Sequence, residues 1–207
     1  MYYAYLAGKI IKDAGKDFIT MVNPHPNYLR GKDLSAIRKL NEVYDIFEFY
    51  RPALGKEQLN TAKSLKKEIW TYSIHGKTTA PEVYRRTYWT NFRDGFTAVS
   101  AYWHHENHAG GDGFNSEDGV RNRVDYGNTY LDMEMGTYLS SKREEANMLG
   151  KEDYKLAEFC RQMLKKTPSP ALQKELDKII SDGAAGDMAA MDDARMKLLE
   201  LAEKLSK

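Results

Sequence analysis

Cysteine, proline and long apolar runs are scarce in this chain of 207 residues, and two of these shortages exclude a class of structure. A disulfide within the chain is excluded, because Cys160 is the only cysteine. No apolar run reaches the ~18 residues that a membrane-spanning helix needs. Neither sign of charge dominates, with 31 Lys and Arg against 30 Asp and Glu, so we expect no nucleic-acid or membrane surface.

The start of the chain gives no sign of export. Residues 1–8 are too short for a signal peptide and lack its basic first region. We expect a soluble chain and leave its localisation open, since a longer parent protein could still be exported.

Aromatic residues are abundant: 14 Tyr, 7 Phe and 3 Trp make up 12% of the chain. Such rings fill cores, and their faces can also stack on sugars.

Strand-like and helix-like segments alternate over the first half of the chain. Helical periodicity predicts four helices, at 2–14, 34–43, 56–67 and 81–92. Short β-rich runs predict four strands, at 18–22, 44–50, 69–74 and 96–103. Strands joined by helices of about 10 to 13 residues are typical of parallel βαβ connections, so the predicted fold class is α/β.

This alternation ends after Trp103. A polar, glycine-rich segment at 104–137 is too long for an ordinary connection. A helix is predicted from Ser141 to about residue 165, and the Thr-Pro-Ser-Pro run at 167–170 then marks a boundary. Two further helices, at 171–180 and 188–205, predict a helical hairpin. We therefore predict two domains, 1–166 and 167–207.

One run of residues carries a family resemblance. It begins with Ser141, Arg143, Glu145 and Ala146 in the pattern S-x-R-x-E-A, and it continues as G-x-E-D-Y at 150–154. The motifs before it, in chain order, are Trp70 with Tyr72, Arg85 or Arg86 with Trp89, Asp94-Gly95-Phe96, Tyr102-Trp103, and Gly111-Asp112-Gly113.

This order of motifs resembles the C-terminal half of a group of glycoside-hydrolase-like (β/α)8-barrel proteins, many of them uncharacterised domains. The chain departs from the group at Met148, where the group has arginine, and at Ser140, where it has proline.

The resemblance implies a TIM-like barrel, but the chain supplies only about four of the eight βα units. We expect a partial (half) TIM-like barrel followed by the helical hairpin. Three explanations stay open: a fragment of a longer protein, a half-barrel completed by a second chain, or a reduced open sheet. We favour the first two. An unpaired half-barrel exposes strand edges and an apolar face, so we expect a homo-oligomer or a missing N-terminal half-barrel.

In such a barrel the chemistry lies at the carboxyl ends of the strands. Glycoside hydrolysis usually needs two carboxyl groups, and we predict Glu48 and Glu106 as the catalytic pair, with Asp112 in reserve. By strand alternation, Glu48 shares a face with Ile46 and Tyr50. An ion-paired or solvent-side role for Glu48, with Arg51 as a partner, is the simpler alternative.

The expected substrate-binding residues are aromatic, histidine and charged side chains near the strand ends: Trp70, Tyr72, His75, Trp103, His104, Asp112 and Arg143. The His104–His108 run also invites a metal interpretation, with His105, Glu106 and Asp112 brought together by a loop. Its order is not that of metalloproteases, and we assign no metal and no cofactor.

The helix that begins near Ser141 has an architectural interpretation as well. Either Ser140 or Ser141 can cap it, with Glu144 as the capping-box carboxylate. Arg143 can pair with a carboxylate at the barrel rim or contact substrate. Glu145 and Asp153, about two turns apart, can tie the helix to neighbouring basic groups.

The leading hypothesis is a glycoside-hydrolase-like protein, or a fragment of one, that acts on a carbohydrate through strand-end carboxylates. The residues leave open whether the chain is an enzyme. A carbohydrate-binding module without catalysis and an oligomerising scaffold are the alternatives.

Overall fold

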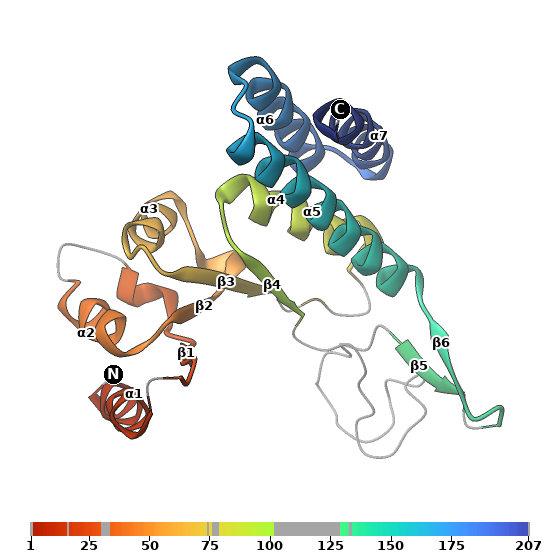
Figure 1. Cartoon of the computed structure of the whole chain (residues 1–207). Coiled ribbons are helices and arrows are strands. Elements are labelled where there is room, and N and C mark those ends of the chain that lie inside the picture. The colour runs from red at the N-terminus through yellow and green to blue at the C-terminus, as the bar shows by residue number, and fades with distance from the viewer. Residues whose placement is uncertain are drawn as a thin grey trace. The chain divides into compact units, whose positions relative to one another are not determined.

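The computed structural model describes residues 2–15, 17–29, 34–73, 75, 79–101, 129–132 and 134–206. Over these residues the protein is α/β and mostly helical, with a four-stranded parallel sheet (Figure 1). The chain divides into two compact units. Unit 1 comprises residues 1–73 and 96–100, and unit 2 comprises residues 74–95 and 101–207.

The sheet of unit 1 contains the four predicted strands in sequence order. They are β1 (Met21–Val22), β2 (Ile46–Tyr50), β3 (Glu68–Ser73) and β4 (Ala98–Ala101). β1 is shorter than predicted, and at its start the amide of Thr20 bonds to the Asp45 side chain in place of a strand partner. Thr20 N donates to Asp45 Oδ2 at 2.9 Å, and Thr20 O accepts from the backbone N–H groups of Asp45 and Ile46.

Three helices belong to unit 1: α1 (Tyr2–Ala14), α2 (Ser35–Val43) and α3 (Lys56–Ser64). The predicted helix 2–14 is confirmed. α3 ends earlier than its pattern predicts, since Lys66 adopts a left-handed backbone with φ 54°. α2 and α3 pack on the sheet through one core, which contains Leu29, Ile37, Leu40, Val43, Phe47, Phe49, Ala62, Ile69 and Phe96.

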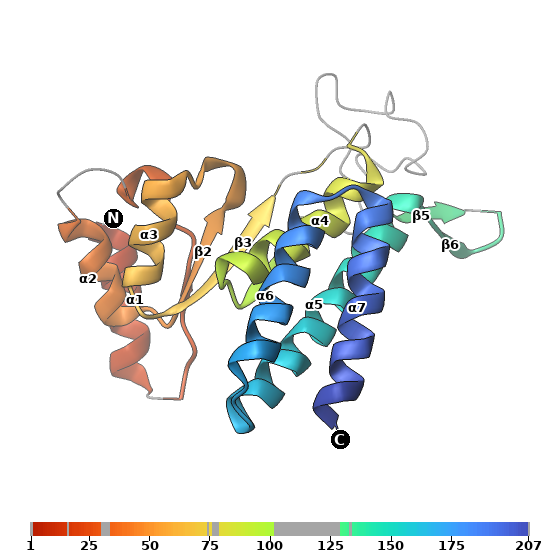
Figure 2. The ribbon, with the colours of Figure 1, turned by 90° about the horizontal axis from the view of Figure 1, so that it is seen from above.

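Four helices pack together in unit 2: α4 (Pro81–Asp94), α5 (Lys142–Lys166), α6 (Pro170–Ala185) and α7 (Met188–Ser206). Figure 2 shows α5, α6 and α7 side by side. α4 starts at a proline and ends at Gly95, whose φ of 77° is the left-handed C-cap conformation. The predicted boundary at 167 falls within unit 2, between α5 and α6.

A β-hairpin lies in the segment that the sequence predicted as a loop. β5 (Thr129–Asp132) pairs antiparallel with β6 (Thr137–Ser140), and Gly136 in the turn has φ 61°. Two Thr-Tyr-Leu runs either side of a turn supply the β-branched and aromatic residues that strands favour. Among the helices that the structure describes, none combines the length and the apolar character needed to cross a membrane.

Candidate functional site

The two faces of the sheet in unit 1 differ in what covers them. Phe47 and Phe49 of β2 are completely buried, and their rings stack with centroids 6.0 Å apart. They belong to the core under α2 and α3, together with Ile69 of β3. Since side chains alternate along a strand, the residues between them point to the other face.

That other face carries a carboxylate among aromatic rings. The register of the parallel pair sets Glu48 beside Trp70, and Tyr50 beside Tyr72. All four side chains are half-buried. We call these four residues the aromatic–carboxylate face. Alternation predicted that Glu48 shares a face with Ile46 and Tyr50, and along β2 Ile46 is buried while Glu48 and Tyr50 are half-buried.

The nearest polar partner of Glu48 comes from the end of β1. Asn23 Nδ2 donates to Glu48 Oε2 at 3.3 Å. Arg51, the expected partner, lies with its guanidinium 5.7 Å from the centroid of the Phe96 ring, and its Nη1 donates to Leu54 O at 3.5 Å. The Glu48 carboxylate thus has an amide neighbour and keeps partial access to solvent. A group that contacts a ligand needs such access.

The aromatic rings of this face are held in place by contacts of their own. Trp70 Nε1 donates to Glu68 Oε1 at 2.8 Å, which fixes the indole. The rings of Tyr50 and Tyr72 lie 5.3 Å apart, tilted by 41°. Fixed rings beside a carboxylate and an amide match the needs of a sugar, whose C–H faces stack on aromatics and whose hydroxyls bond to polar groups.

His75 and Arg143, two predicted binding residues, belong to unit 2. His75 is half-buried, with its ring 4.8 Å from that of Tyr84 and its Nε2 3.4 Å from Thr87 Oγ1. Burial lowers the pKa of His75 below its ordinary value. Arg143 is buried near the start of α5. Both side chains are packed into unit 2.

The remaining predicted site residues, Trp103, His104, Glu106 and Asp112, lie outside the described residues. The second carboxylate and the loop that invites a metal interpretation therefore stay predictions. Within the part of the chain that the structure describes, no group of three His, Cys, Asp or Glu side chains is placed to hold a metal ion.

The start of α5 confirms Ser141, one of the two predicted serines, as the cap. Ser141 is the N-cap residue, and its hydroxyl accepts from Glu144 N at 3.2 Å. The Glu144 carboxylate accepts from Asn147 Nδ2 at 3.2 Å, and Asn147 Oδ1 in turn accepts from Tyr88 OH at 2.7 Å. This chain of bonds attaches α5 to α4.

Asp153, the acidic residue of the G-x-E-D-Y run, is the centre of a buried polar cluster. Its Oδ2 accepts from Arg85 Nε at 2.6 Å and from Trp89 Nε1 at 2.9 Å, and its Oδ1 accepts from Arg195 at 2.7 Å. Arg85 also donates to Asp192 Oδ1 at 2.5 Å. Arg85, Trp89 and Asp153, all residues of the motifs that carry the resemblance, therefore serve helix packing in unit 2.

Sequence reasoning did not anticipate the part that α7 plays in this cluster. Asp192 and Arg195 lie in a helix whose pattern predicts only a packing appendage. Their spacing of i and i+3 places Asp192 and Arg195 on one side of α7, but the helix carries other charges as well, so no sequence signal singles this pair out.

No protein-family model matches the chain, and a search of curated proteins finds no match either.

Proposed function

We propose that this protein is glycoside-hydrolase-like and acts on a carbohydrate at the aromatic–carboxylate face of unit 1. The observation that carries the proposal is the position of Glu48, half-buried beside Trp70 and bonded to the Asn23 amide. A sugar site uses both kinds of group, aromatic rings for stacking and a carboxylate for hydrogen bonds to hydroxyls.

Three residues of the face, and one carboxylate from outside it, have a part in this proposal. The indole of Trp70 and the ring of Tyr72 stack on the apolar face of a sugar ring. Glu48 accepts hydrogen bonds from sugar hydroxyls, and in catalysis it serves as base or nucleophile. Glu106, which follows the fourth strand in the sequence, is the proposed acid.

The sheet supports the further proposal that unit 1 is part of a half-barrel. Four parallel strands in sequence order are the arrangement found within a (β/α)8 barrel. In that architecture helices cover the outer face, as α2 and α3 cover the face of Phe47 and Phe49. The aromatic–carboxylate face then corresponds to the barrel interior.

Carbohydrate binding without cleavage is the second candidate, and one observation favours it. Glu68, two residues before Trp70 in β3, is a second carboxylate beside the face, and it is bonded to the Trp70 indole. A second catalytic carboxyl therefore has to come from elsewhere.

The test is hydrolysis of a panel of aryl glycosides and polysaccharides by the full chain and by Glu48→Gln. The proposal predicts turnover of at least one substrate and a loss of about 10²- to 10⁴-fold in kcat for Glu48→Gln. The matched control is Glu42→Gln, at an exposed glutamate of α2, which leaves kcat unchanged. Equal turnover by Glu48→Gln contradicts a catalytic role, and binding without turnover establishes the second candidate.

A further inference from the structure

α1 presents two apolar sides, and only one of them is used within unit 1. Ala4 and Tyr5 pack against the core of unit 1. A side chain at Gly8 would collide with Val43 and Tyr44, so α1 lies close against the end of α2. Lys12 Nζ fixes the far end of the helix through a 2.6 Å ion pair with Asp45.

The other side of α1 is an exposed apolar stripe of four residues, Tyr3, Ala7, Ile10 and Ala14. Tyr3 is 84% exposed and Ile10 is 68% exposed. Their spacing of four, three and four residues places them on one line along the helix, as in the seam of a coiled coil. An exposed line of this kind is typical of a helix that packs against a partner.

The order of side chains along this stripe is self-complementary. When two copies of α1 lie antiparallel, Tyr3 of one copy faces Ala14 of the other, and Ile10 faces Ala7. Each large side chain then meets a small one, and a two-fold axis repeats both contacts. In a parallel pair Tyr3 would face Tyr3 and Ala7 would face Ala7, which leaves a clash and a gap.

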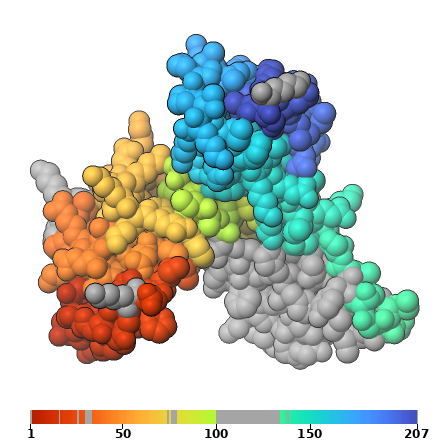
Figure 3. Space-filling view, viewed as in Figure 1, coloured from red at the N-terminus to blue at the C-terminus, as the bar shows by residue number. Residues whose placement is uncertain are grey.

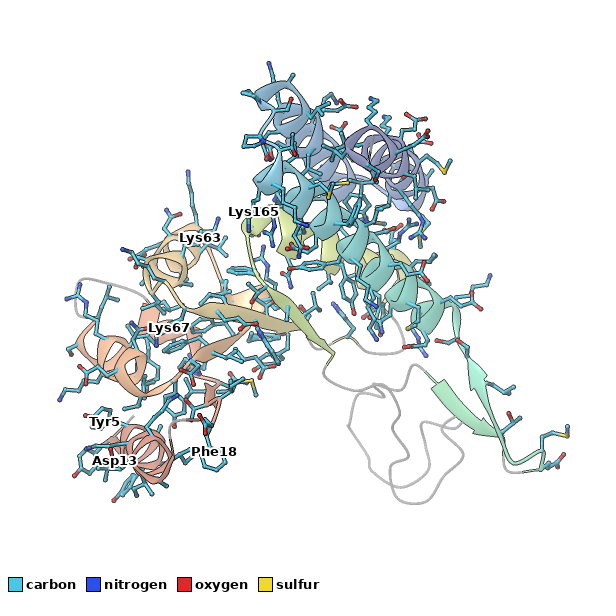
Figure 4. All side chains as sticks on the ribbon, viewed as in Figure 1. Tyr5, Asp13, Phe18, Lys63, Lys67 and Lys165 are labelled. Carbon is cyan, nitrogen blue, oxygen red and sulfur yellow. The ribbon has the colours of Figure 1, made fainter. Side chains whose placement is uncertain are left out.

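The segment after α1 carries further exposed apolar side chains. The ring of Phe18 lies against Gly15 at the end of the helix, and Phe18, Ile19 and Met21 are all exposed. Figure 4 labels Tyr5 and Asp13 on α1 and Phe18 just beyond it, and Figure 3 shows the N-terminal residues, in red, at the molecular surface.

α1 and the segment after it together expose an apolar area of the size that a stable interface buries. Seven large apolar side chains contribute: Tyr2, Tyr3, Ile10, Ile11, Phe18, Ile19 and Met21. At roughly 200 Å² for a fully exposed large side chain, they present on the order of 800 Å². A standard interface buries about this area on each partner.

We propose that the exposed stripe of α1 is a dimer interface, and that it binds α1 of a second copy of this chain in antiparallel orientation.

The first test is the mass of the full chain in solution. Light scattering after size-exclusion chromatography is expected to give twice the 23.8 kDa of one chain. Ile10→Glu and Tyr3→Glu each place a charge in the seam and are expected to give the monomer mass with an unchanged circular dichroism spectrum. The matched control, Met196→Glu, alters a residue of α7 that is 58% exposed and is expected to remain dimeric.

The second test reports on the orientation. In the double variant Tyr3→Cys with Ala14→Cys, the two positions lie about 16 Å apart on one helix, too far for a bond within one copy. Oxidation is expected to give a covalent dimer of the double variant and no covalent dimer of Tyr3→Cys or Ala14→Cys alone. The proposal is overturned if the wild-type chain is monomeric, or if the dimer survives both Ile10→Glu and Tyr3→Glu. Cross-linking of the single variant Tyr3→Cys would overturn the antiparallel arrangement.

Discussion

Arg85 of α4 and Asp153 of α5 form an ion pair in the interior of unit 2, with 2.6 Å between Arg85 Nε and Asp153 Oδ2. Arg85 is 0% exposed and Asp153 is 1% exposed. Such a pair persists in an interior because further bonds satisfy both groups, and here Trp89, Asp192 and Arg195 supply them. The pair fixes α4 against α5.

Replacing Asp153 with alanine is expected to lower the free energy of unfolding by about 3 kcal/mol, because it leaves the Arg85 charge in the interior. The loss falls at the lower end of the range for broken buried pairs, since Asp192 still accepts from Arg85. Urea unfolding followed by circular dichroism measures it.

The control for this prediction is Asp182→Ala. Asp182 pairs with Lys178 on the exposed side of α6, and such a pair contributes less than about 1 kcal/mol. A loss for Asp153→Ala no larger than that for Asp182→Ala would contradict the role given to the buried pair.

Gly183→Ala is expected to destabilise unit 2, although alanine favours a helix. A methyl group at Gly183 would lie 2.5 Å from Cε3 of Trp89, so the indole has to move. Overpacking costs about 1–3 kcal/mol, which exceeds the gain of about 1 kcal/mol in helix propensity. A lower midpoint of thermal unfolding for Gly183→Ala than for Ser181→Ala, at an exposed position of the same helix, is the expected result.

The thiol of Cys160 is expected to be unreactive in the folded protein. It is buried in the core of unit 2, and burial raises its pKa to about 11. A thiol reagent such as Ellman's reagent should label no cysteine at neutral pH and one per chain after unfolding in urea. Rapid labelling without denaturant would show that the α5–α7 packing opens readily.

His75 is expected to make unit 2 less stable as the pH falls below about 6.5, its ordinary pKa. Burial lowers the pKa of His75 in the folded state, so over this range the unfolded chain binds the proton more readily. The stabilising contribution is therefore complete above pH ~6.5 and declines toward lower pH. Unfolding of the wild type and of His75→Gln across this range measures it, and a stability difference that does not change with pH would refute the prediction.

The elements were predictable from local patterns where those patterns are strong. The apolar periodicity of residues 2–14 and the caps at Pro81 and Ser141 gave helix starts that the structure confirms. Strand alternation placed Glu48 opposite the phenylalanines of β2. These features depend on residues close together in the chain.

The long-range relationships were not predictable in the same way. Asp153 joins Arg85, 68 positions upstream, to Arg195, 42 positions downstream, and no local pattern specifies such distant partners. Asn23, which bonds to Glu48, comes from a strand that sequence alone cannot register against β2. The early end of α3 depends on one left-handed residue, Lys66, which is not a type that favours that conformation.

The most direct test of the central claim is binding of a panel of oligosaccharides and polysaccharides to the full chain, compared with binding to Trp70→Ala. The matched control is Tyr28→Ala, which removes an exposed aromatic ring that is not one of the four residues of the aromatic–carboxylate face. We predict that the wild type and Tyr28→Ala bind at least one carbohydrate class equally, and that Trp70→Ala weakens this binding about tenfold, as expected for loss of an aromatic stacking contact. Binding of no carbohydrate, or equal binding by Trp70→Ala, would contradict the account.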